Sequence, residues 1–143
     1  MQESSSLPLI LLASGTGFAP IKALLEHMDH LGLTRPAHLY WGGRRPQDLY
    51  LSDWIEAYVQ SHPWLRYIPV VSDATAEDAW TGRTGFVHRA VLQDHPDFSG
   101  HEVYACGAPI VIDSAKKDFV AQAGLDPELF FADAFTSAAD QAA

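Results

Sequence analysis

Residues 9–20 read LILLASGTGFAP, and this stretch decides the fold. Its first five residues are apolar without a break, which is typical of a strand that is buried on both faces of a sheet. Gly15 and Gly17 follow, and they allow a tight turn and the close approach of a ligand to the backbone. Pro20 suits the first turn of a helix, where its missing N–H leaves no partner unsatisfied. The stretch therefore predicts a strand, a glycine-rich turn and a helix in succession.

The same alternation of apolar runs and helical periodicity continues along the chain. The expected strands cover residues 9–13, 38–41, 65–71, 102–106 and 129–131. Further helices are expected around Trp54, from Phe86 and from Ile112, and residues 72–84 are expected to form a polar loop. This alternation predicts a doubly wound α/β fold, with a parallel five-stranded sheet of order 3-2-1-4-5 and helices on both faces. Such sheets bind ligands at the carboxyl ends of their strands, so we expect function in the loops there.

The composition of the chain argues against several classes of partner and of metal site. The chain carries 9 Lys and Arg residues against 18 Asp and Glu, a net charge of −9, so neither nucleic acid nor a membrane surface is an expected partner. Its single cysteine, Cys106, cannot form a disulfide within the chain or supply a four-cysteine metal site. No apolar run approaches the ~20 residues of a membrane span, and residues 1–6 lack the features of a signal peptide. A cytoplasmic protein is expected.

The 143 residues have the size of one domain. Residues 1–6 are expected to be a linker remnant because serine-rich polar segments stay flexible. Residues 7–135 are expected to form the folded domain, and residues 136–143 a C-terminal tail.

The turn at residues 15–17 is suited to a pyrophosphate, because the helix behind it offers free amides and a partial positive charge. Taken alone, the glycine pair also fits an ordinary turn. The chain has no P-loop, and Pro20 replaces the third glycine of the standard NAD fingerprint. Ser14 lacks the preceding glycine of a nucleophile elbow, which argues against a serine hydrolase.

A set of ordered motifs resembles the nicotinamide-nucleotide domain of the ferredoxin–NADP reductase superfamily. The motifs are GTGFAP at 15–20, YWGGR at 40–44, WTGRTGFV at 80–87, CGAP at 106–109 and FADAF at 131–135. The resemblance covers nearly the whole chain. Within the superfamily the chain is similar to CDP-6-deoxy-3,4-glucoseen reductases, and reductases of multicomponent oxygenases share most of these features.

The resemblance implies the NAD(P)H-binding domain of an oxidoreductase. In the whole flavoprotein, hydride would pass to FAD, and electrons would then pass through a [2Fe–2S] centre to a partner protein in CDP-3,6-dideoxyhexose synthesis. The chain carries no R-x-Y-[ST] flavin signature, so the FAD and [2Fe–2S] domains are expected elsewhere on a longer polypeptide, and this domain is not expected to be active alone. Two alternatives stay open: an oxygenase reductase, and a non-catalytic nucleotide-binding module on the same fold.

The resemblance also implies the site. Cys106 would lie beside the nicotinamide ring, Asp133 near its carboxamide or the cysteine, and Phe135 near the flavin face, although the family more often has Glu at the position of Asp133. These three are the expected catalytic residues, against the alternatives of a buried core thiol and a packed terminal aromatic. The residues expected to bind the cofactor are Gly15, Thr16, Gly17, Phe18, Ala19, Pro20, Arg44, Ser72, Asp73, Cys106 and Gly107.

The choice of nucleotide depends on charge after the third strand. Asp73 would repel the 2′-phosphate of NADPH and can accept a hydrogen bond from a free ribose hydroxyl, so the sequence favours NADH over NADPH. Arg83 lies nearby in the chain and could reverse this preference, while Arg44 is expected to meet the pyrophosphate and Arg45 to be solvated. No metal site is expected.

Overall fold

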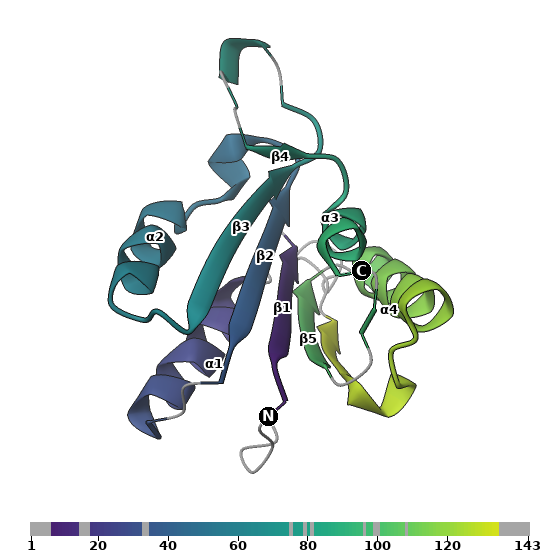
Figure 1. Cartoon of the computed structure of the whole chain (residues 1–143). Coiled ribbons are helices and arrows are strands. Elements are labelled where there is room, and N and C mark those ends of the chain that lie inside the picture. Colours follow the sequence, from purple (N-terminus) through teal and green to yellow (C-terminus); the bar gives the residue numbers. More distant parts are fainter. Residues whose placement is uncertain are drawn as a thin grey trace, which may run out of the picture.

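The computed structural model describes residues 7–14, 18–32, 35–74, 76–78, 80, 82–95, 97–98, 101–107 and 109–134. Across them a parallel sheet lies between two pairs of helices, with α1 and α2 on one face and α3 and α4 on the other (Figure 1). The strands are β1 (Leu9–Ser14), β2 (Ala37–Gly43), β3 (Leu65–Val71), β4 (Arg83–Thr84), β5 (Glu102–Gly107) and β6 (Phe130–Ala134). The helices are α1 (Phe18–His30), α2 (Ser52–Gln60), α3 (Val87–Asp94) and α4 (Pro109–Ala123), with the short 3₁₀ helices η2 (Pro46–Asp48), η3 (Ala76–Asp78) and η4 (Pro127–Leu129).

The strand order is β4-β3-β2-β1-β5-β6, and every neighbouring pair is parallel. The predicted fold class and the order of the five predicted strands are confirmed. The predicted number of strands is wrong by one, because Arg83 and Thr84 form β4 beside Val70 and Val71, where the sequence predicted only a loop. Two residues are too few to produce a recognisable alternation of apolar and polar side chains.

Burial explains why β1 lies at the centre of the sheet. Residues 9–13 are all fully buried, and they alternate between the two faces. Leu9, Leu11 and Ala13 pack in one core with residues of α1 and α2, whereas Ile10 and Leu12 pack in a second core with residues of α3 and α4. A strand covered by helices on both sides needs no polar face, which is why its sequence is an unbroken apolar run.

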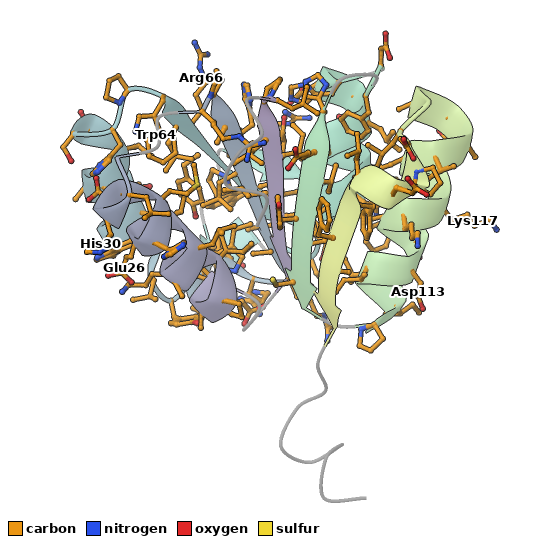
Figure 2. All side chains as sticks on the ribbon, turned by 90° about the horizontal axis from the view of Figure 1, so that it is seen from below. Glu26, His30, Trp64, Arg66, Asp113 and Lys117 are labelled. Atoms are coloured by element: carbon orange, nitrogen blue, oxygen red, sulfur yellow. The ribbon has the colours of Figure 1, made fainter. Side chains whose placement is uncertain are left out.

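Several charged residues of the outer helices point away from the sheet. Figure 2 shows Glu26 and His30 of α1 on one flank and Asp113 and Lys117 of α4 on the opposite flank. The described part of the chain has no helix that is both long enough and apolar enough to span a bilayer.

A buried ion pair holds the amino-terminal edge of the sheet. The Arg35 guanidinium lies 3.2 Å from Glu102 Oε2 and donates a 2.7 Å hydrogen bond to the carbonyl of Leu7. Removing one partner of such a pair leaves a buried charge uncompensated, so each of the two residues requires the other. This anchor fixes the entry of the chain into β1, at the edge opposite to the strand ends where the predicted site lies.

Candidate functional site

A cleft of about 700 Å³ lies at the carboxyl edge of the sheet. The ends of β1, β2 and β3 form one side of it, and the first turn of α3 together with one face of α4 forms the other. Its lining residues are Ser14, Gly42, Gly43, Arg44, Asp48, Ser72, Gly85, Phe86, Val87, His88, Arg89, Ile110, Val111, Ser114, Lys117 and Asp118. Helices α1, α3 and α4 all begin at this edge, so three helix amino termini direct free N–H groups and partial positive charge towards it.

Two close backbone approaches shape the cleft. Gly107 has φ of +143°, and a Cβ there would lie 2.7 Å from Ser14 Cβ and 2.8 Å from its carbonyl oxygen. A Cβ on Gly42 would lie 2.5 Å from Val87 Cβ, so the start of α3 packs directly on the backbone at the end of β2. Glycine is required at both positions, because a side chain there would overlap Ser14 or Val87.

Arg44 stands at the mouth of the cleft with 81% of its side chain exposed. Its Nη2 lies 3.5 Å from Asp73 Oδ2, and the Asp73 side chain is 68% exposed. The backbone N–H of Asp73 also donates to the Arg44 carbonyl at 2.8 Å. The structure therefore brings together the predicted cation and the predicted ribose-reading carboxylate, which the sequence analysis treated separately.

The other two arginines of interest are held by ion pairs. Arg45 donates from Nε and Nη2 to the two carboxylate oxygens of Asp78, each at 2.8 Å, and this bond raises the pKa of Arg45. Arg45 is thus paired with a carboxylate, while 41% of its side chain stays exposed to solvent. Arg83 donates to Asp94 at 2.8 and 3.0 Å and to Gln93 at 2.9 Å. Neither arginine is among the residues that line the cleft.

Burial places Phe18 and Cys106 beneath the edge of the sheet. Phe18 is fully buried, and its ring stacks on Trp41 with centroids 4.0 Å apart. Cys106 is 7% exposed and packs in the core under α1, and neither residue is among those that line the cleft. The backbone of Cys106 is in register with Asp133 on β6. The cofactor-binding role of Phe18 and the catalytic roles of Cys106 and Asp133 stay predictions.

The remaining predicted residues are placed as follows. Ala19 is exposed and Pro20 is half-buried in the first turn of α1, while Ser72 lines the cleft. Gly15, Thr16, Gly17 and Phe135 lie outside the described residues, as do the predicted linker at 1–6 and tail at 136–143.

The wall of the cleft that α3 and α4 form was not predicted from the sequence. His88 Nε2 lies 3.1 Å from Asp118 Oδ2, which links the two helices, and the exposed side chains of Phe86 and Ile110 stand at the rim. The aromatic-Val motif at residues 86–87 was recognised, but the partner 30 residues later carries no sequence signal. Arg89 and Lys117 add two cations to the wall. Together with Arg44 they offer the positive charge that a pyrophosphate needs on an acidic protein.

The predicted cofactor class fits this geometry. A dinucleotide needs a concave edge with free amides, nearby cations and glycines that permit close approach. The cleft supplies helix amino termini, Arg44, and the glycine backbone at Gly42 and Gly43. No ligand is required to explain the fold itself, since both cores are filled by side chains of the chain.

Comparisons with known proteins agree with this assignment. The chain is 43% identical over 135 residues to protein RfbI of Salmonella typhimurium strain LT2, which covers 94% of this chain and 40% of that protein. It is 45% identical over 133 residues to the CDP-6-deoxy-L-threo-D-glycero-4-hexulose-3-dehydrase reductase of Yersinia pseudotuberculosis, covering 93% of this chain and 39% of the relative. Among solved structures, the Amycolatopsis cytochrome P450 reductase GcoB superposes with a TM-score of 0.82 at 29% identity, over 94% of this chain and 39% of that one.

The chain thus spans about two fifths of the length of these relatives. The family model for the oxidoreductase NAD-binding domain matches residues 11–117, which include the carboxyl-terminal part of β1, the cleft-lining ends of β2 and β3, and the first turns of α3 and α4. The chain belongs to the oxidoreductase NAD-binding domain family and has the fold of ferredoxin–NADP reductase-like enzymes.

Proposed function

We propose that this chain is the NADH-binding domain of a flavin-dependent reductase that supplies electrons to a dehydratase acting on a CDP-linked 6-deoxyhexose. The observation that carries the proposal is the 45% identity, over 93% of this chain, to a Yersinia reductase named for that dehydrase. Because the chain spans 39% of that relative, the FAD and [2Fe–2S] groups are assigned to the remainder of such a polypeptide. The electron acceptor would be a separate protein.

The residues of the chain itself would bind and orient the nucleotide. Bound NADH would supply the hydride for the flavin of the whole protein. The amino terminus of α1, together with the preceding turn at residues 15–17, would hold the pyrophosphate, and Arg44 would add a cation. The backbone at Gly107, which approaches Ser14 closely, would let the nucleotide lie against the end of β5.

Charge at the mouth of the cleft supports NADH rather than NADPH. Asp73, whose side chain is exposed beside Arg44, would lie where the family resemblance implies that the adenosine ribose is read, and a carboxylate there would repel a 2′-phosphate. Arg83, the residue that could have offset this repulsion, is bonded to Asp94 and Gln93. Arg44 lies beside Asp73, so the carboxylate would bind the ribose and the guanidinium would bind the phosphate.

We assign Cys106, Asp133 and Phe135 the roles that the family resemblance implies, next to the nicotinamide and the flavin. The register of Cys106 with Asp133 supports this assignment for two of the three, because it puts both backbones at the same level of the sheet edge. The burial of Cys106 means that its thiol would act at short range, as a small uncharged neighbour of the ring.

An oxygenase reductase is the rival within the same enzyme class, and the fit to the cytochrome P450 reductase GcoB is the observation that favours it. A chimaera separates the proposals: residues 7–134 of this chain replace the matching segment of the Yersinia reductase. We expect the chimaera to deliver electrons from NADH to the dehydrase reaction at a rate within about tenfold of that of the parent enzyme, since the flavin-facing edge is retained. A folded chimaera that binds flavin but does not oxidise NADH would contradict the proposal. Activity only when the same segment is placed in GcoB would favour the oxygenase reading.

A further inference from the structure

The turn after β2 is held by one carboxylate. Asp48 Oδ2 accepts hydrogen bonds from the backbone N–H groups of both Arg44 and Arg45, each at 3.0 Å. The backbone N–H of Asp48 in turn donates to the Arg45 carbonyl at 3.0 Å. These three bonds close the turn on itself, and Asp48 lines the cleft beside it.

The turn is folded tightly, and it is tied to the next strand. A Cβ on Gly43 would lie 2.8 Å from Asp48 Cβ, so the carboxylate reaches the two amides only because residue 43 has no side chain. The backbone N–H groups of Ser72 and Asp73 donate to the carbonyls of Gly43 and Arg44, at 2.9 and 2.8 Å. The position of the turn therefore sets the position of the segment that carries Asp73.

The two arginines of this turn take different roles. The guanidinium of Arg45 is bonded to Asp78, whose side chain is 3% exposed, and this bond fixes one side of the turn. The guanidinium of Arg44 stays 81% exposed at the cleft, beside Asp73. With Arg45 anchored and both amides held by Asp48, the backbone of Arg44 has little freedom, and its side chain is kept at the mouth of the cleft.

We propose that Asp48 is a positioning residue of the nucleotide site, which acts by fixing the backbone of Arg44 and thereby the Arg44–Asp73 pair that meets the nucleotide. The inference rests on the proposed function and deepens it. Asp48 itself need not contact the nucleotide, because both of its acceptor bonds are made to the turn.

The proposal predicts the opposite sign from simple electrostatics. Removing a carboxylate from the lining of the cleft lowers the repulsion of an anionic nucleotide, so charge alone predicts tighter binding of NADH by Asp48→Ala. A positioning role predicts weaker binding, because the turn loses the acceptor that holds Arg44. Asp48→Asn separates the two effects, since the amide oxygen keeps an acceptor while the charge is lost.

The test is calorimetric titration of the chain with NADH. Asp48→Ala should raise the Kd by about five- to tenfold, the range expected when one or two hydrogen bonds that order a binding loop are lost. Asp48→Asn should stay close to the wild-type Kd or bind more tightly. In the double variant with Arg44→Ala, the loss should equal that of Arg44→Ala alone, because Asp48 acts through that residue.

Asp126→Ala is the matched control. Asp126 is also a carboxylate that binds backbone at a 3₁₀ helix, with its Oδ1 accepting from the backbone N–H of Glu128 at 3.0 Å, but it is not a residue that lines the cleft. This variant should lose a comparable capping bond and leave the Kd for NADH unchanged.

Three results of the titration would overturn the inference: Asp48→Ala binding NADH as tightly as wild type, Asp48→Asn losing as much affinity as Asp48→Ala, or losses that add in the double variant.

Amide spectra without nucleotide provide a second readout, since a positioning role predicts shifts confined to residues 43–48 and 72–73. Global loss of the fold in Asp48→Ala would contradict it. If the wild-type chain fails to bind NADH, the proposed function falls together with this inference, whereas normal binding by the variants refutes the inference alone.

Discussion

Gly107 shows how one residue can define a site by having no side chain. Its φ of +143° is a conformation that other residues rarely adopt, and its Cα faces Ser14 at the end of the neighbouring strand β1. The cysteine before it needs no such freedom, because Cys106 is an ordinary buried strand residue. The glycine therefore marks the point where the end of β5 packs directly on the end of β1.

Gly107→Ala should lower the free energy of unfolding by about 2–4 kcal/mol, since it combines an unfavourable φ with overpacking against Ser14. Gly124→Ala is the control, because Gly124 has φ of +71° but nothing within 4 Å of an added Cβ. That variant should cost only about 1 kcal/mol, the penalty of the left-handed conformation. Denaturant unfolding of both variants measures the difference, and equal losses would show that the contact with Ser14 is not tight.

At the residue scale, Arg44 and Asp73 could each be predicted from the sequence, but the ion pair between them could not. The motif YWGGR identifies Arg44, and position after a strand identifies Asp73. Their 3.5 Å contact depends on the register of β2 with β3, which places Gly43 opposite Val71. Register follows from the packing of the whole sheet, so no local pattern contains it.

At the scale of elements, α3 is held at its carboxyl end by a polar network. Asp94 accepts a 2.7 Å bond from the Tyr40 hydroxyl and two bonds from Arg83. Burial alone would raise the pKa of Asp94, but the bonds from Arg83 and Tyr40 outweigh it and lower that pKa. Burial of the Tyr40 hydroxyl and its bond to Asp94 raise the pKa of Tyr40. The network joins β2 and β4 to the carboxyl end of α3, and so it supports the helix whose first turn lines the cleft.

Histidines beside this network predict a loss of stability on the acid side. The rings of His38 and His95 lie 4.9 Å apart, edge to face, and His95 lies 5.8 Å from His101. Burial lowers the pKa of both His38 and His95. Arg66 and His101 lower the pKa of His38 further, His38 and His101 lower that of His95, and Asp94 opposes both shifts. A pKa that is lower in the folded state means that the unfolded state binds protons first.

Stability should therefore be full above pH 6.5, the ordinary histidine pKa, and should decline as the pH falls through the lowered values in the folded protein. Melting temperatures at pH 7.5, 6.5 and 5.5 measure this decline. His95→Gln should flatten the profile, and His30→Gln, on the exposed surface of α1, should leave it unchanged. An unchanged slope in His95→Gln would exclude this histidine as its source.

Most elements could be predicted, and the exceptions have a common cause. Long apolar runs and helical periodicity revealed β1, α1 and their successors because each buries a whole face. The two-residue β4 and the 3₁₀ helices η2 and η3 are only two or three residues long, so their sequences carry no period. The bond from His88 on α3 to Asp118 on α4 was beyond prediction for the same reason, since it depends on how two helices pack.

At the scale of the whole molecule, charge distribution supports the location of the site. The chain has a net charge of −9, yet Arg44, Arg89 and Lys117 gather around one cleft. The opposite edge of the sheet is closed by the buried pair of Arg35 and Glu102. The molecule thus has one edge built for stability and another that exposes helix amino termini, glycine backbone and cations, as is general for open parallel sheets.

The measurement that tests this account most directly is an amide NMR titration of the ¹⁵N-labelled chain with NADH and, separately, with NADPH. The account predicts that NADH shifts the amides of residues 42–44, 72–73 and 106–107, which lie at the carboxyl edge, and that NADPH requires a higher concentration to do so. Equal or tighter binding of NADPH would contradict the role of Asp73. No shifts at these residues, or shifts centred on the amino-terminal edge around Arg35 and Glu102, would contradict the assignment of the nucleotide site itself.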